Sequence, residues 1–287
     1  MSAGLGDLVG RSYGPFVVEV SRDRVAEFAD VTGDDPARWS DHAPPLFANV
    51  ALFAVAPALL EDPAVAPFTT SLIHSEQTFE WGRSLAIGER LRVTGEVAGV
   101  RARGPVNLVT FRLSVDADAG TWLAGEAVFL MSDAAAAESA EEPEPDALVA
   151  PEIDGPATTR ELPDVGGELE SLRCGASRLD LVRYAAVTRD WNPIHWDHRS
   201  AVAAGLPGIV VHGLLMAAWA GRAASRYAPN PHPLASMSLR FRRPLRPGVA
   251  AVVTGSVDAV ASDGADLDLV LASGGERLVT GRARVTR

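Results

Sequence analysis

Two long apolar runs dominate the pattern of hydrophobic and polar positions along the chain. They cover residues 45–60 in the first half and residues 214–226 in the second half. Both runs are apolar around most of a helical circumference, so we expect two buried helices rather than two surface helices. Asn49 and Pro57 interrupt the first run, which is shorter than the ~20 residues that a membrane span requires.

Segments with a period of two follow each apolar run. Phe79 and Trp81 flank Glu80 in the first half, and residues 237–241 alternate between apolar and polar in the second half. This alternation is typical of strands with one buried face, and turns containing glycine separate the later strands. One buried helix followed by antiparallel strands predicts an α+β fold in each half, with the sheet wrapped round the helix.

The two halves resemble copies of one unit. Residues 21–34 read SRDRVAEFADVTGD and residues 177–190 read SRLDLVRYAAVTRD, an offset of 156 positions (177 − 21). Further on, VTGEV begins at Val93 and VTGSV begins at Val253, an offset of 160 (253 − 93). Changes in loop length produce such a drift, so we interpret the chain as an internal duplication.

An acidic segment separates the two copies. Residues 133–154 contain eight acidic residues and no Lys or Arg, with Ala and Pro between them. Such a composition cannot bury enough apolar surface to order itself, although 134–140 would also suit a solvated acidic helix. We therefore expect a first domain over 1–132, a linker over 133–160 and a second domain over 161–287.

Composition restricts the class of protein. The chain has 287 residues, of which 47% are hydrophobic and 22% charged, as in ordinary globular proteins. The net charge of -11 disfavours nucleic acid as a partner. Residues 1–10 lack the pattern of a secretory signal. The single cysteine, Cys174, cannot form an internal disulfide, which favours a reducing, cytoplasmic location; a nucleophilic role for it is less favoured than packing.

The candidate chemistry lies within residues 184–213. A predicted helix runs into Asp190, and Pro193 then forces the chain out of the helix. Asn192 before this proline is a turn signal, so Asp190 and His195 should lie on either side of a tight turn and face one pocket. A carboxylate beside an imidazole is a competent acid–base pair near neutral pH.

His212 and Gly213 come directly before the second apolar run. The first N–H groups of a helix have no partner within the helix and can stabilise a developing oxyanion. A glycine at position 213 would let a substrate carbonyl approach without a side chain in the way. An isolated Asp or His more often has a structural role, but this ordered set of residues is far more specific.

The set resembles the MaoC-like family, which includes (R)-specific enoyl-CoA hydratases (hydratase 2) and 3-hydroxyacyl-thioester dehydratases. The resemblance is close over 184–219 and looser towards the C-terminus. It implies a hotdog fold, hence a double hotdog for the whole chain. It also implies that Asp190 and His195 are the catalytic pair, that Asn192 supports their geometry, and that Gly213 supplies an oxyanion N–H.

The first half resembles the N-terminal domain of two-domain fatty-acyl dehydratases, over residues 28–34 and 74–81. Asp34 is retained there, but the segment DDPARW is one residue shorter than DWNPIHW and places Arg38 where a His would fall. We therefore expect this half to be catalytically silent. In related double-hotdog proteins the silent half shapes the acyl tunnel, and the resemblance implies that role here.

Several basic residues are candidates for substrate binding. Arg189 replaces the Gly that usually precedes the catalytic Asp of this family, and Arg does not easily adopt a positive φ. We expect either a slightly different turn or a contact between Arg189 and a phosphate of the thioester carrier. His212 is a further candidate for substrate binding. The last candidates belong to a basic stretch on and after a predicted strand. These arginines either face solvent on the sheet or bind a phosphate of the carrier: Arg240, Arg242, Arg243 and Arg246.

Metal and nucleotide cofactors are not expected. His195, His198 and His212 suggest zinc, but no cysteine accompanies them and the acid–base reading already accounts for His195. No G-x-G-x-x-G motif follows a predicted strand, which disfavours a nicotinamide or flavin site.

We therefore expect reversible hydration of trans-2-enoyl thioesters to (R)-3-hydroxyacyl thioesters. The carrier would be CoA or an acyl carrier protein, and no cofactor is needed because water is the only other reactant. The two halves would form a pseudo-dimer within one chain, and a homodimer of such chains is compatible with the sequence. Two alternatives stay open: a hotdog that binds acyl thioesters without turnover, and a hotdog thioesterase. Acyl chain length, carrier and direction cannot be read from the sequence.

Overall fold

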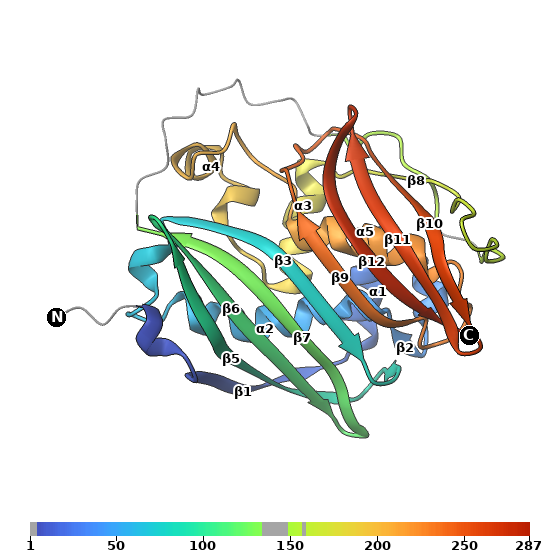
Figure 1. Cartoon of the computed structure of the whole chain (residues 1–287), viewed down its shortest axis with the longest axis horizontal. Coiled ribbons are helices and arrows are strands. Elements are labelled where there is room, and N and C mark those ends of the chain that lie inside the picture. The colour runs from blue at the N-terminus through green and yellow to red at the C-terminus, as the bar shows by residue number, and fades with distance from the viewer. Residues whose placement is uncertain (1–4, 134–148, 157–158) are drawn as a thin grey trace.

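One continuous antiparallel sheet joins the two halves in the computed structural model, which describes residues 5–133, 149–156 and 159–287 (Figure 1). Its ten strands follow the order β1-β5-β6-β7-β3-β9-β12-β11-β10-β8. The first half contributes β1 (Ser12–Glu19), β3 (Ser71–Trp81), β5 (Arg90–Arg103), β6 (Val106–Ala117) and β7 (Gly120–Ser132). The second half contributes β8 (Leu172–Cys174), β9 (Leu234–Phe241), β10 (Ala251–Ala261), β11 (Gly264–Ser273) and β12 (Glu276–Thr286). A separate short pair consists of β2 (His42–Ala43) and β4 (Leu85–Ala86).

Each half wraps its part of the sheet round one long helix, as predicted (Figure 1). The two helices are α2 (Ala48–Leu60) and α5 (Gly213–Ser225), and all residues of α5 except Gly213 are buried. The shorter helices are α1 (Arg22–Val31), α3 (Arg178–Thr188) and α4 (His198–Ala203). Single 3-10 turns are η1 (Leu5–Leu8), η2 (Pro36–Trp39), η3 (Pro45–Phe47), η4 (Ala66–Thr69) and η5 (Pro193–His195). No helix in the described ranges has the length and apolarity needed to cross a membrane.

The duplicated segments fold alike because they carry the same local signals. Ser21 caps α1 and Ser177 caps α3, and the Ser177 cap is a full capping box with Asp180. Both helices end in a left-handed residue, which is Gly33 (φ 75°) after α1 and Arg189 (φ 74°) after α3. The expectation of a different turn at Arg189 is therefore wrong. The turn is kept, and the arginine adopts a conformation that costs roughly 1–2 kcal/mol for a residue with a Cβ.

The predicted linker is only partly described, since 134–148 and 157–158 lie outside the described residues. The described part packs on the second half. The backbone N–H of Asp154 donates to the Arg173 carbonyl at 3.0 Å, and the Asp154 carboxylate accepts from the Arg173 N–H at 2.6 Å. The Arg222 guanidinium donates to the Asp154 carbonyl at 3.1 Å. Asp154, which lies within the predicted linker, therefore contacts the second half.

The junction between the halves consists of β3 and β9 in the sheet and of helices beneath it. Glu76 of β3 stands opposite Arg240 of β9, and their side chains form an ion pair at 3.3 Å. Below the sheet, Arg24 of α1 donates from Nε to the Val187 carbonyl of α3 at 2.8 Å. The second half therefore depends on the first half to cover a sheet edge and part of its helical layer.

We expect residues 161–287, expressed alone, to self-associate or precipitate. Removal of the first half would leave the β9 edge with unpaired backbone groups and would expose apolar surface, which templates association. Size-exclusion chromatography with light scattering measures the outcome, with the full chain as control. A stable monomeric second half would contradict this dependence.

Candidate active site

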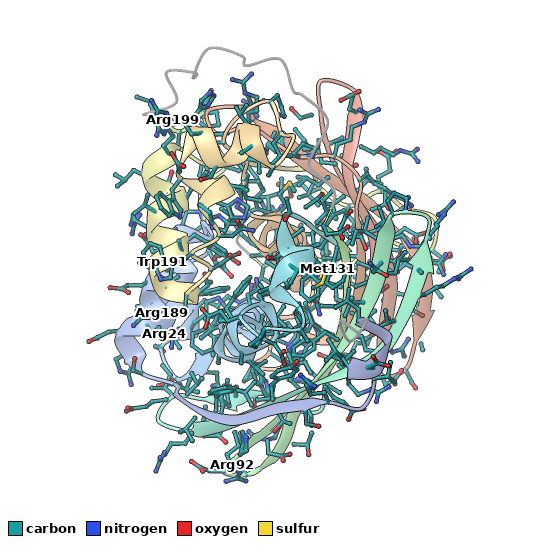
Figure 2. All side chains as sticks on the ribbon, turned by 90° about the vertical axis from the view of Figure 1, so that its left-hand side faces the viewer. Arg24, Arg92, Met131, Arg189, Trp191 and Arg199 are labelled. Atoms are coloured by element: carbon teal, nitrogen blue, oxygen red, sulfur yellow. The ribbon has the colours of Figure 1, made fainter. Side chains whose placement is uncertain are left out.

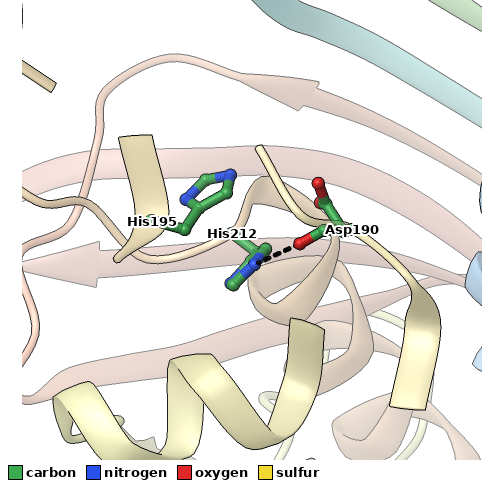
Figure 3. A group of neighbouring side chains, drawn as sticks. All are labelled: Asp190, His195 and His212. Atoms are coloured by element: carbon green, nitrogen blue, oxygen red, sulfur yellow. Dashed lines mark hydrogen bonds between the residues drawn. The ribbon is translucent and has the colours of Figure 1, made fainter. Parts of the chain in front are cut away.

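Asp190, His195 and His212 converge in the interior of the second half (Figure 3). Asp190 follows the left-handed turn after α3, His195 ends η5, and His212 is the residue before α5. Their exposed fractions are 6%, 7% and 0%. One side-chain nitrogen or oxygen of each lies within 4.8 Å of those of the others. The structure thus brings the predicted acid–base pair together and adds His212 to it.

The His195 ring is held in one tautomer. Its Nδ1 lies 2.8 Å from the Val210 carbonyl oxygen. Because a carbonyl can only accept, Nδ1 carries the hydrogen and Nε2 is the basic nitrogen of the neutral ring. Burial lowers the pKa of His195 to about 4, although the Val210 hydrogen bond opposes this shift. At neutral pH, His195 is therefore an uncharged ring with an available proton acceptor.

Asp190 is a carboxylate buried without a cationic partner. Burial raises its pKa from 3.8 to about 7, while a 3.4 Å hydrogen bond from the Asn192 N–H acts in the opposite direction. Among the described residues, no charged group contributes to this shift of the Asp190 pKa. Asp190 can thus be protonated or ionised near neutral pH, which suits a group that both gives and takes a proton.

His212 contacts both members of this pair. Its ring stacks on that of His195, with a centroid distance of 3.7 Å and an interplanar angle of 26°. Its Nε2 donates to the backbone carbonyl of Asp190 at 3.4 Å (Figure 3). Burial, together with the neighbouring His195, lowers the pKa of His212 well below the usual value. A neutral His212 therefore holds the turn that carries Asp190.

Asn192 and Gly213 occupy the positions that the sequence predicts for them. The Asn192 side chain accepts from the Ile194 N–H at 3.3 Å and so caps the short helix η5 that ends at His195. Gly213 is the first residue of α5, so its N–H has no acceptor one turn earlier in the helix. A Cβ at position 213 would lie 3.5 Å from the Phe241 ring, an ordinary contact distance.

The other predicted binding residues are the arginines Arg189, Arg240 and Arg242. Arg240 pairs with Glu76, and Arg242 donates to the Thr280 hydroxyl at 3.3 Å. Figure 2 shows Arg189 near Arg24 and Trp191 on one face of the molecule. The pKa of Arg24 is lowered first by burial and then by the charge of Arg189, so these two guanidinium groups lie near each other.

The remaining candidates are placed as follows. Three histidines were considered as zinc ligands, and two of them, His195 and His212, lie close together. Among the described residues, the third side chain near enough to share a metal ion with them is Asp190, not His198. Cys174 is buried, and burial raises the pKa of its thiol to about 12. A protonated, inaccessible thiol fits packing rather than nucleophilic attack.

The equivalent position in the first half is filled with side chains. The Trp39 indole donates to the Asp34 carboxylate at 2.8 Å. Arg38 points away to the carbonyl of Ser225 at 2.8 Å, and the Arg222 guanidinium lies so close to Gly33 that a Cβ there would be 2.5 Å from it. The remaining cavity measures about 10 Å³, which is about one water. Trp39 and Arg222 are residues that the sequence motifs did not single out.

Comparisons with family models find two dehydratase regions. Residues 163–267 match the MaoC like domain, and residues 7–125 match the FAS1-like dehydratase domain region. The two matches fall on the two predicted domains, and the first includes all the residues of the Asp190 cluster.

Among curated relatives, a UPF0336 protein of Streptomyces coelicolor is 30% identical over 126 residues, which are 39% of this chain and 84% of the relative. The mitochondrial 3-hydroxyacyl-[acyl-carrier-protein] dehydratase of Arabidopsis thaliana is 37% identical over 97 residues, or 34% of this chain and 56% of that protein.

Two solved structures share the fold over nearly the whole chain. A MaoC-like dehydratase superimposes with a TM-score of 0.80 at 21% identity and covers 99% of both chains. A Mycobacterium tuberculosis protein described as having a double hotdog fold gives a TM-score of 0.67 at 16% identity, covering 97% of this chain and 96% of the other. The predicted double hotdog is confirmed.

We expect Asp34→Asn to leave turnover within a few-fold of the wild type. The Asp34 carboxylate is occupied by Trp39 and has no space for a substrate. Steady-state rates on an enoyl thioester measure the effect. A loss as large as that of Asp190→Asn would show that the first half also performs chemistry.

We expect Asp190→Asn to stabilise the folded protein at pH 8 but not at pH 4. The folded-state pKa of about 7 exceeds the unfolded value of 3.8, so the folded state holds the proton more tightly and loses stability as pH rises through this window. The variant avoids the buried charge, and we expect a gain of roughly 2–4 kcal/mol at pH 8. Urea unfolding at both pH values measures it; an equal difference at both would contradict the buried, uncompensated carboxylate.

Proposed function

The chain belongs to the MaoC-like family of double-hotdog hydratases and dehydratases, and on that premise we propose that it adds water reversibly to trans-2-enoyl thioesters. The observation that carries the proposal is the buried cluster of Asp190 and His195, in which the Val210 carbonyl leaves Nε2 as the basic nitrogen of His195. The product would be the (R)-3-hydroxyacyl thioester, by resemblance to the family. The thioester carrier would be CoA or an acyl carrier protein.

The roles follow from the protonation states. The neutral His195 offers Nε2 as a base, which would take a proton from water while the hydroxide adds to the β-carbon. Asp190, with a pKa of about 7, would deliver a proton to the α-carbon. Dehydration is the same sequence in reverse. One O–H bond of water and the C=C π bond are broken, and one C–O and one C–H bond are formed. Return of a proton from His195 to Asp190 restores both groups, so no further reactant is required.

The thioester carbonyl would be polarised by the N–H of Gly213. As electrons move from the double bond towards the carbonyl, the oxygen gains negative charge, and an N–H at the first turn of α5 is oriented to stabilise it. In this arrangement His212 would hold the Asp190 turn rather than contact substrate.

The carrier would be recognised outside the buried cluster of Asp190, His195 and His212. Arg189 lies next to Asp190 in the chain and is exposed, and Arg24 and Trp191 lie near it (Figure 2). Guanidinium groups bind phosphate well, so we propose that Arg189 contacts a phosphate of the carrier. Arg240 and Arg242 are engaged by Glu76 and Thr280 and are weaker candidates for this role.

We predict that the protein consumes the enoyl chromophore of crotonyl-CoA without releasing free thiol, and that a chelator leaves the rate unchanged. Asp190→Asn and His195→Ala should each lower kcat by about 10²–10⁴, as general acid–base groups do. Asp34→Asn, the same change at the duplicated position, is the matched control.

Three outcomes would contradict the proposal. Release of free thiol would indicate a thioesterase. Binding of the thioester without turnover would indicate a binding module. Near wild-type turnover in either variant would remove that residue from the mechanism.

A further inference from the structure

Asn49 is a polar residue in the otherwise apolar helix α2 of the first half, yet its side chain contacts the second half. It is fully buried, with an exposed fraction of 0%. Its Nδ2 donates to the Tyr184 hydroxyl oxygen at 3.1 Å and to the Leu214 carbonyl oxygen at 3.0 Å. Tyr184 belongs to α3, and Leu214 follows Gly213 in α5. One amide of the first half thus contacts the two elements that carry the candidate site.

These two contacts determine the direction of the Tyr184 hydroxyl. The Leu214 carbonyl can only accept, so the amide must present its NH₂ group on this side. The second hydrogen of the same NH₂ goes to Tyr184, whose oxygen therefore accepts. The O–H hydrogen of Tyr184 is left to point elsewhere, and among the described residues no other hydrogen bond of this hydroxyl is formed.

The Tyr184 ring borders the acid–base cluster. It is fully buried, and its centroid lies 4.9 Å from that of His212, which in turn stacks on His195. Burial and the nearby Asp190 raise the pKa of Tyr184 well above its ordinary value, so the hydroxyl keeps its proton. Tyr184 therefore stays uncharged at any pH at which the protein works.

The duplication shows that this polar pair is not required by the fold. The offset of 156 places Phe28 at the position of Tyr184 (184 − 156). Asn49 and Leu214 are the second residues of two 13-residue helices, so Leu214 corresponds to Asn49. The equivalent pair at the first-half site is therefore apolar and consists of Phe28 from the first half and Leu214 from the second half. A buried polar pair has a desolvation cost that an apolar pair avoids, and only the site with Asp190 and His195 carries it.

We propose that Asn49 is a positioning residue for the active site of the other half. It holds the Tyr184 ring against His212, which in turn contacts the Asp190 turn and the His195 ring, and it holds the first turn of α5 beside Gly213. The inference rests on the proposed hydratase function. It assigns the first half a direct part in the chemistry of the second half, in addition to any part in shaping the acyl tunnel.

A double-mutant cycle tests the relay with the substitutions that the duplication itself supplies. Asn49→Leu and Tyr184→Phe each copy the residue of the other half, and the double variant reproduces an apolar pair already used in this fold. We expect each single variant to lower kcat on crotonyl-CoA about 10–100-fold with little change in KM, because each change removes the same buried hydrogen bond behind the catalytic turn. The double variant should be no slower than the slower single variant, because both changes interrupt one relay.

The pH profile gives a readout that packing alone would not change. His212 holds the turn that carries Asp190, so displacement of the His212 ring should shift the Asp190 limb of the kcat profile in both single variants. The other titratable groups facing Asp190, His195 and His212, are unchanged. Trp39→Phe, which removes a hydrogen bond to Asp34 in the first half, is the matched control and should leave kcat and the profile unaltered.

The outcomes separate the relay from the function on which it rests. If the wild type is active and the effects of the two single variants multiply in the double variant, the relay is overturned while the function stands. Single variants with the activity of the wild type would also overturn the relay alone. If Asn49→Leu does not fold, Tyr184→Phe alone decides: wild-type kcat and an unshifted profile overturn the relay. An inactive wild type would overturn both the proposed function and the relay.

Discussion

The burial of Asp190 without a cationic partner is the constraint on which the rest of the structure depends. Desolvation raises the pKa of this carboxyl to about 7, which places its proton exchange near neutral pH. The same burial keeps His195 neutral, so its free nitrogen is available as a base. An arginine in the pocket would lower the pKa of Asp190 and remove this property. The surroundings accordingly consist of neutral imidazoles, a phenol and an amide.

A single hotdog half could not provide that environment. The second half supplies Asp190, His195 and Gly213, while Asn49 enters from the first half and the β3–β9 pairing closes the sheet beside them. The duplicated position in the first half has the opposite character. There the Trp39 indole donates a hydrogen bond to the Asp34 carboxylate, and Arg222 of α5 extends to Gly33. The two halves thus exchange side chains across their interface: Asn49 reaches the second half, and Arg222 reaches the first half.

Local signals made much of this predictable. The apolar runs predict the two buried helices, and the strands with a period of two predict the sheet of each hotdog unit. The turn between Asp190 and His195 follows from the proline that ends the preceding helix. The site's other features depend on contacts between distant segments, which leave no periodic trace in the sequence. Asn49 looked like an interruption of an apolar run, because its partner Tyr184 lies 135 residues away. The left-handed Arg189 also went against expectation, since the rest of the turn outweighs the cost of its Cβ.

The most direct test of the account is the fate of solvent hydrogen during the reaction. Hydration of crotonyl-CoA in D₂O, followed by NMR of the product, should give a 3-hydroxybutyryl thioester with one deuterium at the α-carbon in a single configuration. The Asp190→Asn and His195→Ala variants should form this product far more slowly. A free carboxylic acid with released thiol, or unaltered crotonyl-CoA after prolonged incubation with the wild type, would contradict the assignment of Asp190 and His195 as a hydrating acid–base pair.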